Sequence, residues 1–165
     1  MKTIFALFLP IFCVLSACSY SEEQINGFDK RIEKFTVGKS FHLEKSESGL
    51  YTEIMKAGTG REIHLTDSIG VTYIGTLLSG KKFDEQKKPI YLPMRGVIDG
   101  WKEALIGQKQ GVKLRIIVPP QLGYGAGGMG EVPPNATLYF ELSVVSKTRI
   151  INIIDGKYKE IKMGG

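Results

Sequence analysis

The sequence predicts an α+β domain in which an antiparallel sheet is covered on its apolar face by a single helix. Two observations support this prediction. Several segments alternate apolar and polar residues, as at 112–118, where Lys113 and Arg115 separate apolar neighbours; this is the pattern of half-buried strands. One convincing helical pattern interrupts them, at 97–106. A sheet with one apolar face and one helix to cover it belongs to this class.

Size and charge limit what the chain can do. With 165 residues, of which 42% are hydrophobic and 24% charged, we expect one domain with appendages. The net charge of +5 is spread over mixed runs such as Lys81–Glu85 and forms no basic helix. Nucleic acid is therefore not an expected partner.

Residues 1–17 are interpreted as a lipoprotein signal peptide. Lys2 precedes an apolar run that is interrupted by Pro10 and falls short of the roughly 20 residues that a membrane-spanning helix needs. Leu15-Ser16-Ala17-Cys18 resembles the lipobox of bacterial lipoproteins, in which the cysteine is acylated and becomes the new N-terminus. An ordinary secretory signal that is cleaved nearby remains the alternative.

Lipidation of Cys18 would anchor the chain in a bacterial cell envelope, facing the periplasm. Several acyl chains on one cysteine meet the requirement for stable anchoring. Ser19 in place of aspartate favours the outer membrane, by analogy with known sorting. Because Cys13 leaves with the signal and Cys18 carries lipid, no thiol remains for a disulfide, a metal site or a nucleophile.

The segment 18–47 is predicted to be a lipid-anchored tether that is in part helical. Ile25, Phe28, Ile32 and Phe35 recur at three- and four-residue steps, on one face of a helix, although Gly27 weakens the pattern. Two interpretations stay open: a flexible tether between lipid and domain, or a short helix that packs on the domain or on a second copy.

The main domain is expected at 48–147. Strands are predicted at 50–55, 67–78, 112–118 and 138–144, with a turn at Ser79-Gly80 and with Gly107 ending the helix. A C-terminal extension, 148–165, is predicted to form a β-hairpin: strands at 150–154 and 157–162 flank Asp155-Gly156, a pair that suits a tight turn. The role of this extension stays open.

Two features suggest chemistry that the sequence does not support. Gly123–Gly130 matches a dinucleotide-binding fingerprint, but such a loop must open a helix, and Val132-Pro133-Pro134 follows instead. We therefore expect a flexible surface loop. His42 and His64 stand in no metal-ligand spacing and beside no candidate nucleophile, so both are expected at the surface. No metal or cofactor is predicted.

A set of large apolar residues in turns and at strand ends forms the candidate site. Taken singly, each fits a core position better than a site, since such residues are buried by default. Two features point beyond packing: Tyr124 sits among glycines, where a core residue would be poorly anchored, and Asp84 directly follows Phe83, at the edge of apolar surface.

Six blocks in order resemble the motifs of the FKBP-type peptidyl-prolyl isomerase family, and the resemblance covers about 48–146. The blocks are Val71–Leu77, Ser79–Asp84, Pro89–Leu92, Val97–Trp101, Leu122–Gly125 and Val132–Phe140. The resemblance implies a strongly bent antiparallel sheet wrapped around one short helix, with a proline-binding pocket between them.

The resemblance also assigns roles to individual residues. Trp101 would form the pocket floor, and Ile98 would present its backbone N–H to the ligand. The Tyr124 hydroxyl would meet a substrate carbonyl, and Asp84 would lie at the rim and hydrogen-bond within the site. The walls and further substrate contacts would come from Tyr73, Phe83, Phe140, Ile90, Leu92, Val97, Ile98 and Val132.

This chain departs from the family at two positions of the rim. Ile90 and Leu92 stand where the family often has phenylalanines, and the glycine loop is shorter than in small cytosolic eukaryotic members. A looser rim predicts weaker binding of macrolide inhibitors and leaves the basic activity intact.

The implied function is peptidyl-prolyl cis-trans isomerisation that assists the folding of exported or envelope proteins. Resonance holds an X-Pro amide planar against a barrier of about 18–20 kcal/mol. No bond breaks during rotation, so no nucleophile, metal or cofactor is needed, and a dry aromatic pocket can favour the twisted amide. The expected partners are proline-containing polypeptides, and the oligomeric state stays open.

Two other functions stay open. A chaperone or a module of an envelope machine could use the same pocket with incidental activity, although such proteins more often carry an inserted flap. A lipid-anchored scaffold would need no pocket with Asp84, Trp101 and Tyr124 together.

Overall fold

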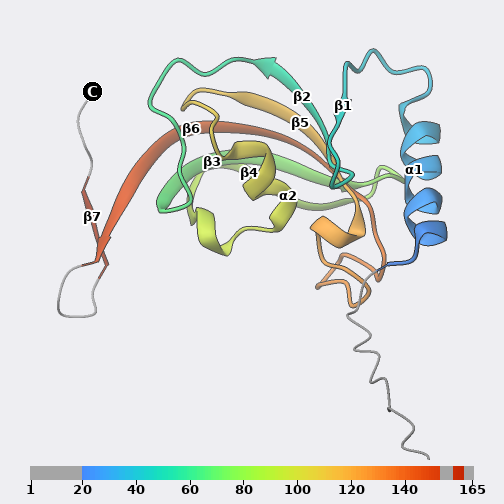
Figure 1. Ribbon diagram of the computed structural model, residues 1–165. Helices are drawn as coiled ribbons and strands as arrows, with labels where there is room; N and C mark the ends of the chain where they lie inside the picture. The colour runs from blue at the N-terminus through green and yellow to red at the C-terminus, as the bar shows by residue number, and fades with distance from the viewer. Residues whose placement is uncertain (1–19, 153–157, 162–165) are drawn as a thin grey trace, which may run out of the picture.

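The computed structural model describes residues 20–152 and 158–161 (Figure 1). The predicted signal peptide, Cys18 and the Asp155-Gly156 turn lie outside these residues. In the described part of the chain, no helix combines the length and the apolar character that crossing a membrane requires.

Within the described residues, seven antiparallel strands form one sheet. They are β1 (Glu44–Lys45), β2 (Tyr51–Lys56), β3 (Asp67–Leu77), β4 (Lys82–Pro93), β5 (Lys113–Val118), β6 (Leu138–Asn152) and β7 (Tyr158–Ile161). Their order is β1-β2-β5-β6-β3-β4, and β7 pairs with β6. Figure 1 shows the long strands β3 and β6 bending over the helix α2 (Asp99–Leu105). The predicted fold class, a bent antiparallel sheet around one short helix, is confirmed.

The main core lies between the sheet and α2. Alternation along β5 directs Leu114, Ile116 and Val118 into this core. On α2, Trp101, Ala104 and Leu105 are buried against the same cluster. Gly100 permits this close packing, because a Cβ there would lie 2.6 Å from Cγ1 of Val118. After α2 the chain reverses at Gly107, whose φ of +84° favours glycine.

A second helix, α1 (Glu22–Thr36), packs on the domain. Ser21 begins it with a capping box, since its Oγ accepts from the Gln24 N–H and its own N–H donates to Gln24 Oε1. Phe28 and Ile32 are 5% and 0% exposed, and Asp29 accepts hydrogen bonds from Lys45 (2.6 Å) and Tyr51 (3.1 Å). Of the two interpretations of this segment, the structure has the docked helix.

The helix α1 lies on the face of the sheet opposite α2. Its Phe35 packs on Tyr139, with 5.5 Å between ring centroids. Tyr139 alternates along β6 with Leu138 and Phe140, which belong to the core beneath α2. The N-terminal segment therefore covers part of the outer face of the sheet.

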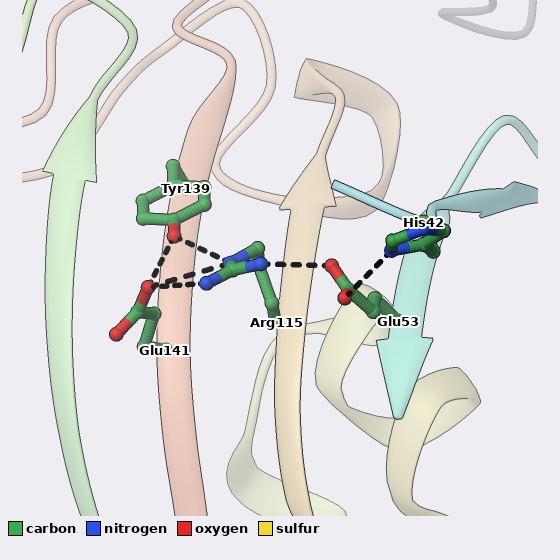
Figure 2. Close-up of polar contacts among 5 residues, drawn as sticks. All are labelled: His42, Glu53, Arg115, Tyr139 and Glu141. Atoms are coloured by element: carbon green, nitrogen blue, oxygen red, sulfur yellow. Dashed lines mark hydrogen bonds and ion pairs between the residues drawn. The ribbon is translucent and has the colours of Figure 1, made fainter. Parts of the chain in front are cut away.

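The same outer face carries a half-buried ion-pair cluster (Figure 2). Arg115 donates to Glu53 at 2.8 Å and to Tyr139 at 2.9 Å, and its third partner is Glu141 at 3.2 Å. Only about 15% of the Arg115 and Glu53 side chains is exposed. His42 touches the cluster from solvent, 3.8 Å from Glu53 and 88% exposed, so its prediction as a surface residue is confirmed.

Two strands differ from the sequence-based expectation. The twelve-residue strand β4 was not predicted, because it is an edge strand whose polar run 84–88 does not alternate, and Pro89 is tolerated there. The strand β6, predicted at 138–144, continues past the expected end of the domain at 147 to Asn152, and its last residues pair with β7. The first strand of the predicted C-terminal hairpin is thus an extension of a core strand.

Candidate active site

A pocket of about 390 Å³ opens between the bent sheet and the start of α2. Of the predicted pocket residues, all except Ile90 and Val132 line it. Its lining consists of Tyr73, Phe83, Asp84, Leu92, Gly96, Val97, Ile98, Trp101, Tyr124, Met129 and Phe140.

Four aromatic side chains form one edge-to-face network around the pocket. The Trp101 ring lies 5.1 Å from Tyr73 and 5.3 Å from Phe140, and Phe83 lies 5.6 Å from Phe140, all with rings near perpendicular. Such contacts stabilise aromatic pairs beyond their buried area. The network gives the pocket rigid apolar walls.

A β-bulge brings two consecutive residues, Phe83 and Asp84, to the same pocket. On a regular strand, neighbouring side chains point to opposite faces. Here Gly75 pairs with Asp84 while Thr76 pairs with Lys82, so Phe83 is the extra residue of β4. The bulge therefore places an aromatic ring and a carboxylate side by side.

Gly75 makes room for two of these rings. A Cβ at this position would lie 2.7 Å from Cζ of Phe83 and 2.9 Å from Cε1 of Phe140, well inside ordinary contact distances. Gly75 pairs with Phe140 on β6, so the rings cross directly over its backbone. No local sequence pattern indicates this role of Gly75, which follows only from the pairing of β3 with its two neighbours.

The polar groups of the pocket are a carboxylate and two tyrosine hydroxyls. The Tyr73 hydroxyl donates a hydrogen bond to Asp84, as expected for a carboxylate that bonds within the site. Burial, together with this bond, raises the pKa of Tyr73. Burial and the negative charge of Asp84 also raise the pKa of Tyr124. Both tyrosines are thus neutral hydrogen-bond donors at physiological pH.

The start of α2 also lines the pocket, through Val97, Ile98 and Trp101. Ile98 is the N-cap residue, and its carbonyl accepts from Trp101 N–H (3.0 Å) and Lys102 N–H (3.2 Å). The N–H of an N-cap residue lies outside the hydrogen-bond ladder of its helix. Ile98 is therefore suited to present this N–H to a ligand.

The loop that carries Tyr124 opens no helix. The 3₁₀ helix Pro120–Leu122 precedes it, and the loop then returns through an isolated bridge between Met129 and Val132. Gly128, at a φ of +67°, donates its N–H to the Tyr124 carbonyl at 3.2 Å. This geometry lacks the helix N-terminus that a phosphate-cradling loop needs, in agreement with the sequence-based exclusion.

Two residues predicted as substrate contacts do not line this pocket. Ile90 pairs with Val71 on β3, and it packs against the core instead of lining the pocket. Val132 is 5% exposed and belongs to the core cluster, because the tight return of the loop turns it inward.

Two residues of the lining were not predicted. Gly96 ends the 3₁₀ helix Met94–Gly96, and Met129 lies at the rim with 63% of its surface exposed. A lone methionine in a glycine-rich loop carries no periodic signal that would have indicated it. Among the described residues, no group of three or more His, Cys, Asp or Glu side chains could hold a metal ion.

Comparison with known proteins places this pocket in a family. A family model described as FKBP-type peptidyl-prolyl cis-trans isomerase matches residues 59–145. The isomerase FkpA of Escherichia coli strain K12 is 37% identical over 116 residues, which cover 68% of this chain and 42% of FkpA. A probable FKBP-type isomerase of Haemophilus influenzae is 40% identical over 121 residues, covering 71% of this chain and 49% of that protein. The chain thus matches less than half the length of these relatives.

Solved structures agree. The crystal structure of E. coli FkpA has a TM-score of 0.68 at 33% identity, covering 77% of this chain and 60% of that chain. A peptidyl-prolyl cis-trans isomerase of Pseudomonas syringae has a TM-score of 0.66 at 25% identity, covering 78% of this chain and 96% of that chain. This chain therefore belongs to the FKBP-type peptidyl-prolyl cis-trans isomerase family.

Proposed function

We propose that the chain catalyses cis-trans isomerisation of X-Pro bonds in exported polypeptides, with the proline ring seated in the pocket on Trp101. The observation that carries this proposal is the aromatic enclosure, with its four rings in edge-to-face contact and only a few polar groups. A pocket of about 390 Å³ lies within the usual range for small-molecule sites and accommodates a proline with its flanking peptide groups.

The geometry supports catalysis by preferential binding of the twisted amide. Twisting removes the resonance that polarises the amide, so the transition state loses less than the planar state when it leaves water for an apolar pocket. The Ile98 N–H and the Tyr124 hydroxyl, both from residues that line the pocket, can each donate to a substrate carbonyl. Asp84 holds the Tyr73 hydroxyl and keeps that wall of the pocket in place.

Three substitutions test this proposal in the purified chain. Trp101→Leu keeps the floor apolar but removes the ring, Tyr124→Phe removes one donor, and Asp84→Asn weakens the acceptor of Tyr73. Each should lower kcat/KM for an X-Pro peptide by about tenfold, the factor that corresponds to about 1.4 kcal/mol. Tyr91→Phe is the matched control, because Tyr91 is half exposed and lines no part of the pocket. Well-folded variants with wild-type rates would overturn the proposal and favour a binding module without catalysis.

A second part of the proposal concerns location. We propose that Cys18 is lipidated and that the chain acts at the periplasmic side of a bacterial envelope membrane, on the basis of the signal-like segment and the lipobox-like residues. Tyr20 is already docked on the domain through Asn135, so about 7 Å of extended chain separates its Cα from that of Cys18. The pocket would thus work close to the bilayer surface and not at the end of a long tether.

Membrane fractionation with palmitate labelling tests the anchor. Cys18→Ala should abolish labelling and release the chain from membranes, whereas Cys13→Ala, in the predicted signal, should change neither. A Cys18→Ala chain that stays labelled and membrane-bound would contradict the lipoprotein assignment.

A further inference from the structure

We propose that Tyr20, in the segment before α1, is a positioning residue of the pocket: it fixes the backbone of loop 123–137 and so places the Tyr124 hydroxyl. The inference rests on the proposed function of Tyr124 as a donor to the substrate. It connects a residue outside the matched family region, 59–145, with the reacting site.

The first contact joins the N-terminal segment to the loop. The Tyr20 hydroxyl donates to Asn135 Oδ1 at 2.8 Å, across 115 positions of sequence. Its ring is held edge-on by Phe28 of α1, at 5.0 Å between centroids, and Phe28 is itself buried. Figure 1 shows this blue segment running beside the orange loop. Tyr20 is therefore a supported side chain with a defined acceptor.

The second contact joins Asn135 to the residue beside Tyr124. The Asn135 N–H donates to the Gly125 carbonyl at 2.9 Å, and the Gly125 N–H donates to the Pro120 carbonyl at 2.9 Å. In the described chain, Asn135 is the only non-glycine residue with positive φ, at +56°, a conformation that asparagine tolerates better than most residues. A Cβ on Gly125 would lie 4.0 Å from the Tyr20 hydroxyl. Tyr20 and Asn135 thus hold the peptide unit that follows Gly125, one residue along the chain from Tyr124.

The loop needs this support more than α1 does. Loop 123–130 contains glycines at five of its eight positions, and glycine loses the most conformational freedom on ordering. Glu131, also in loop 123–137, forms an ion pair with Lys81 that is exposed on both sides and contributes little. In contrast, α1 is held by two buried side chains and by the bonds of Asp29 to Lys45 and Tyr51.

The test is a double-mutant cycle on the full chain, with kcat/KM for an X-Pro peptide as the measure. Tyr20→Phe removes only the hydroxyl and should lower kcat/KM about threefold to tenfold, the range expected for losing one hydrogen bond that holds a catalytic group. Tyr51→Phe is the matched control: it also removes a hydroxyl that docks α1, to Asp29 at 3.1 Å, but it touches no part of the loop and should leave the rate unchanged.

The decisive comparison uses the Tyr124→Phe background. If Tyr20 acts by placing the Tyr124 hydroxyl, Tyr20→Phe should have no further effect once that hydroxyl is gone. Asn135→Gly, which keeps the positive φ accessible, should reproduce the loss and should add nothing to Tyr20→Phe. Amide exchange of Gly125 and Gly128 should rise in Tyr20→Phe and not in Tyr51→Phe.

The outcomes separate the inference from its premise. A wild-type kcat/KM for Tyr124→Phe overturns the role of Tyr124 as a donor, and with it the positioning role of Tyr20. If Tyr124→Phe lowers kcat/KM and adding Tyr20→Phe lowers it again by the same factor as in the wild type, only the positioning role of Tyr20 is overturned, because Tyr20 then acts through general stability. A wild-type rate for Tyr20→Phe alone also overturns it.

Discussion

Alanine at Gly75 tests whether the two phenylalanine rings over β3 must keep their positions for catalysis. The added Cβ would lie 2.7 Å from Phe83 and 2.9 Å from Phe140, whereas carbon atoms rest at about 3.5–4.0 Å. Both rings must therefore move by about 1 Å, into the pocket or away from it. Overpacking of this kind costs about 1–3 kcal/mol of folding free energy, and a displacement of about 1 Å at a reacting site can cost about a hundredfold in rate. We expect kcat/KM to fall between tenfold and a hundredfold.

The assay is isomerisation of an X-Pro peptide at low temperature, alongside urea unfolding of the same samples. Gly70→Ala is the matched control on the same strand. Its Cβ would lie 2.3 Å from Oγ of Ser146, a hydroxyl group that can rotate away, and 3.2 Å from Cε1 of the half-exposed Tyr91. Gly70 lines no part of the pocket. Gly70→Ala should keep the wild-type rate. A Gly75→Ala chain as active as wild type, or an equal loss of activity in Gly70→Ala, would show that catalysis does not depend on the positions of these two rings.

Three further predictions concern pH, the outer face and α1. Since burial raises the pKa of Tyr73 and Tyr124 above the usual value of about 10, kcat/KM should show no tyrosine titration between about pH 7 and about pH 9. Because the pKa of Tyr73 is higher in the folded than in the unfolded chain, its contribution to stability is complete below about pH 10 and is lost as the pH rises toward the folded-state pKa. Tyr73→Phe should therefore reduce the fall of Tm in alkali, and an unchanged fall would contradict this. Arg115→Ala leaves the largely buried Glu53 without its 2.8 Å partner and should lower the free energy of unfolding in urea by about 2–4 kcal/mol. Its kcat/KM should stay unchanged, because the cluster faces away from the pocket. Lys81→Ala removes an exposed ion pair and should have no measurable effect on stability. Gly27→Ala on α1 has no atom within 4 Å of the new Cβ and should raise stability by about 0.5–1 kcal/mol; a drop on thermal unfolding would indicate an unseen contact.

Local pattern was sufficient for the parts of the fold that repeat regularly. The predicted strands at 67–78 and 112–118 match β3 and β5 to within one residue, and the predicted helix at 97–106 contains α2. These segments alternate, or recur with helical period, because one face packs on the core. The strand β4 was not predicted, because an edge strand with polar residues on both faces shows no alternation of apolar and polar residues.

The same limit applies to the pocket. Most of its side chains were identified from family motifs, but Ile90 and Val132 lie outside its lining, and Met129, which lines it, was not predicted. Each of these depends on local backbone geometry: the register shift in β4 beside Val71 for Ile90, and the bridged turn for Val132 and Met129. A motif names a residue without reporting which way a bulge or a turn directs it.

The sequence by itself determined several core strands and the single covering helix, because these follow from residue type and short-range periodicity, and its ordered family motifs named most side chains of the pocket. Only the tertiary structure decided that Phe83 and Asp84 share one face, that Gly75 must lack a side chain, and that α1 is docked with Tyr20 hydrogen-bonded to Asn135, 115 positions away. Strand register and long-range docking arise from packing between distant segments, and no local pattern records which distant segment will be the neighbour.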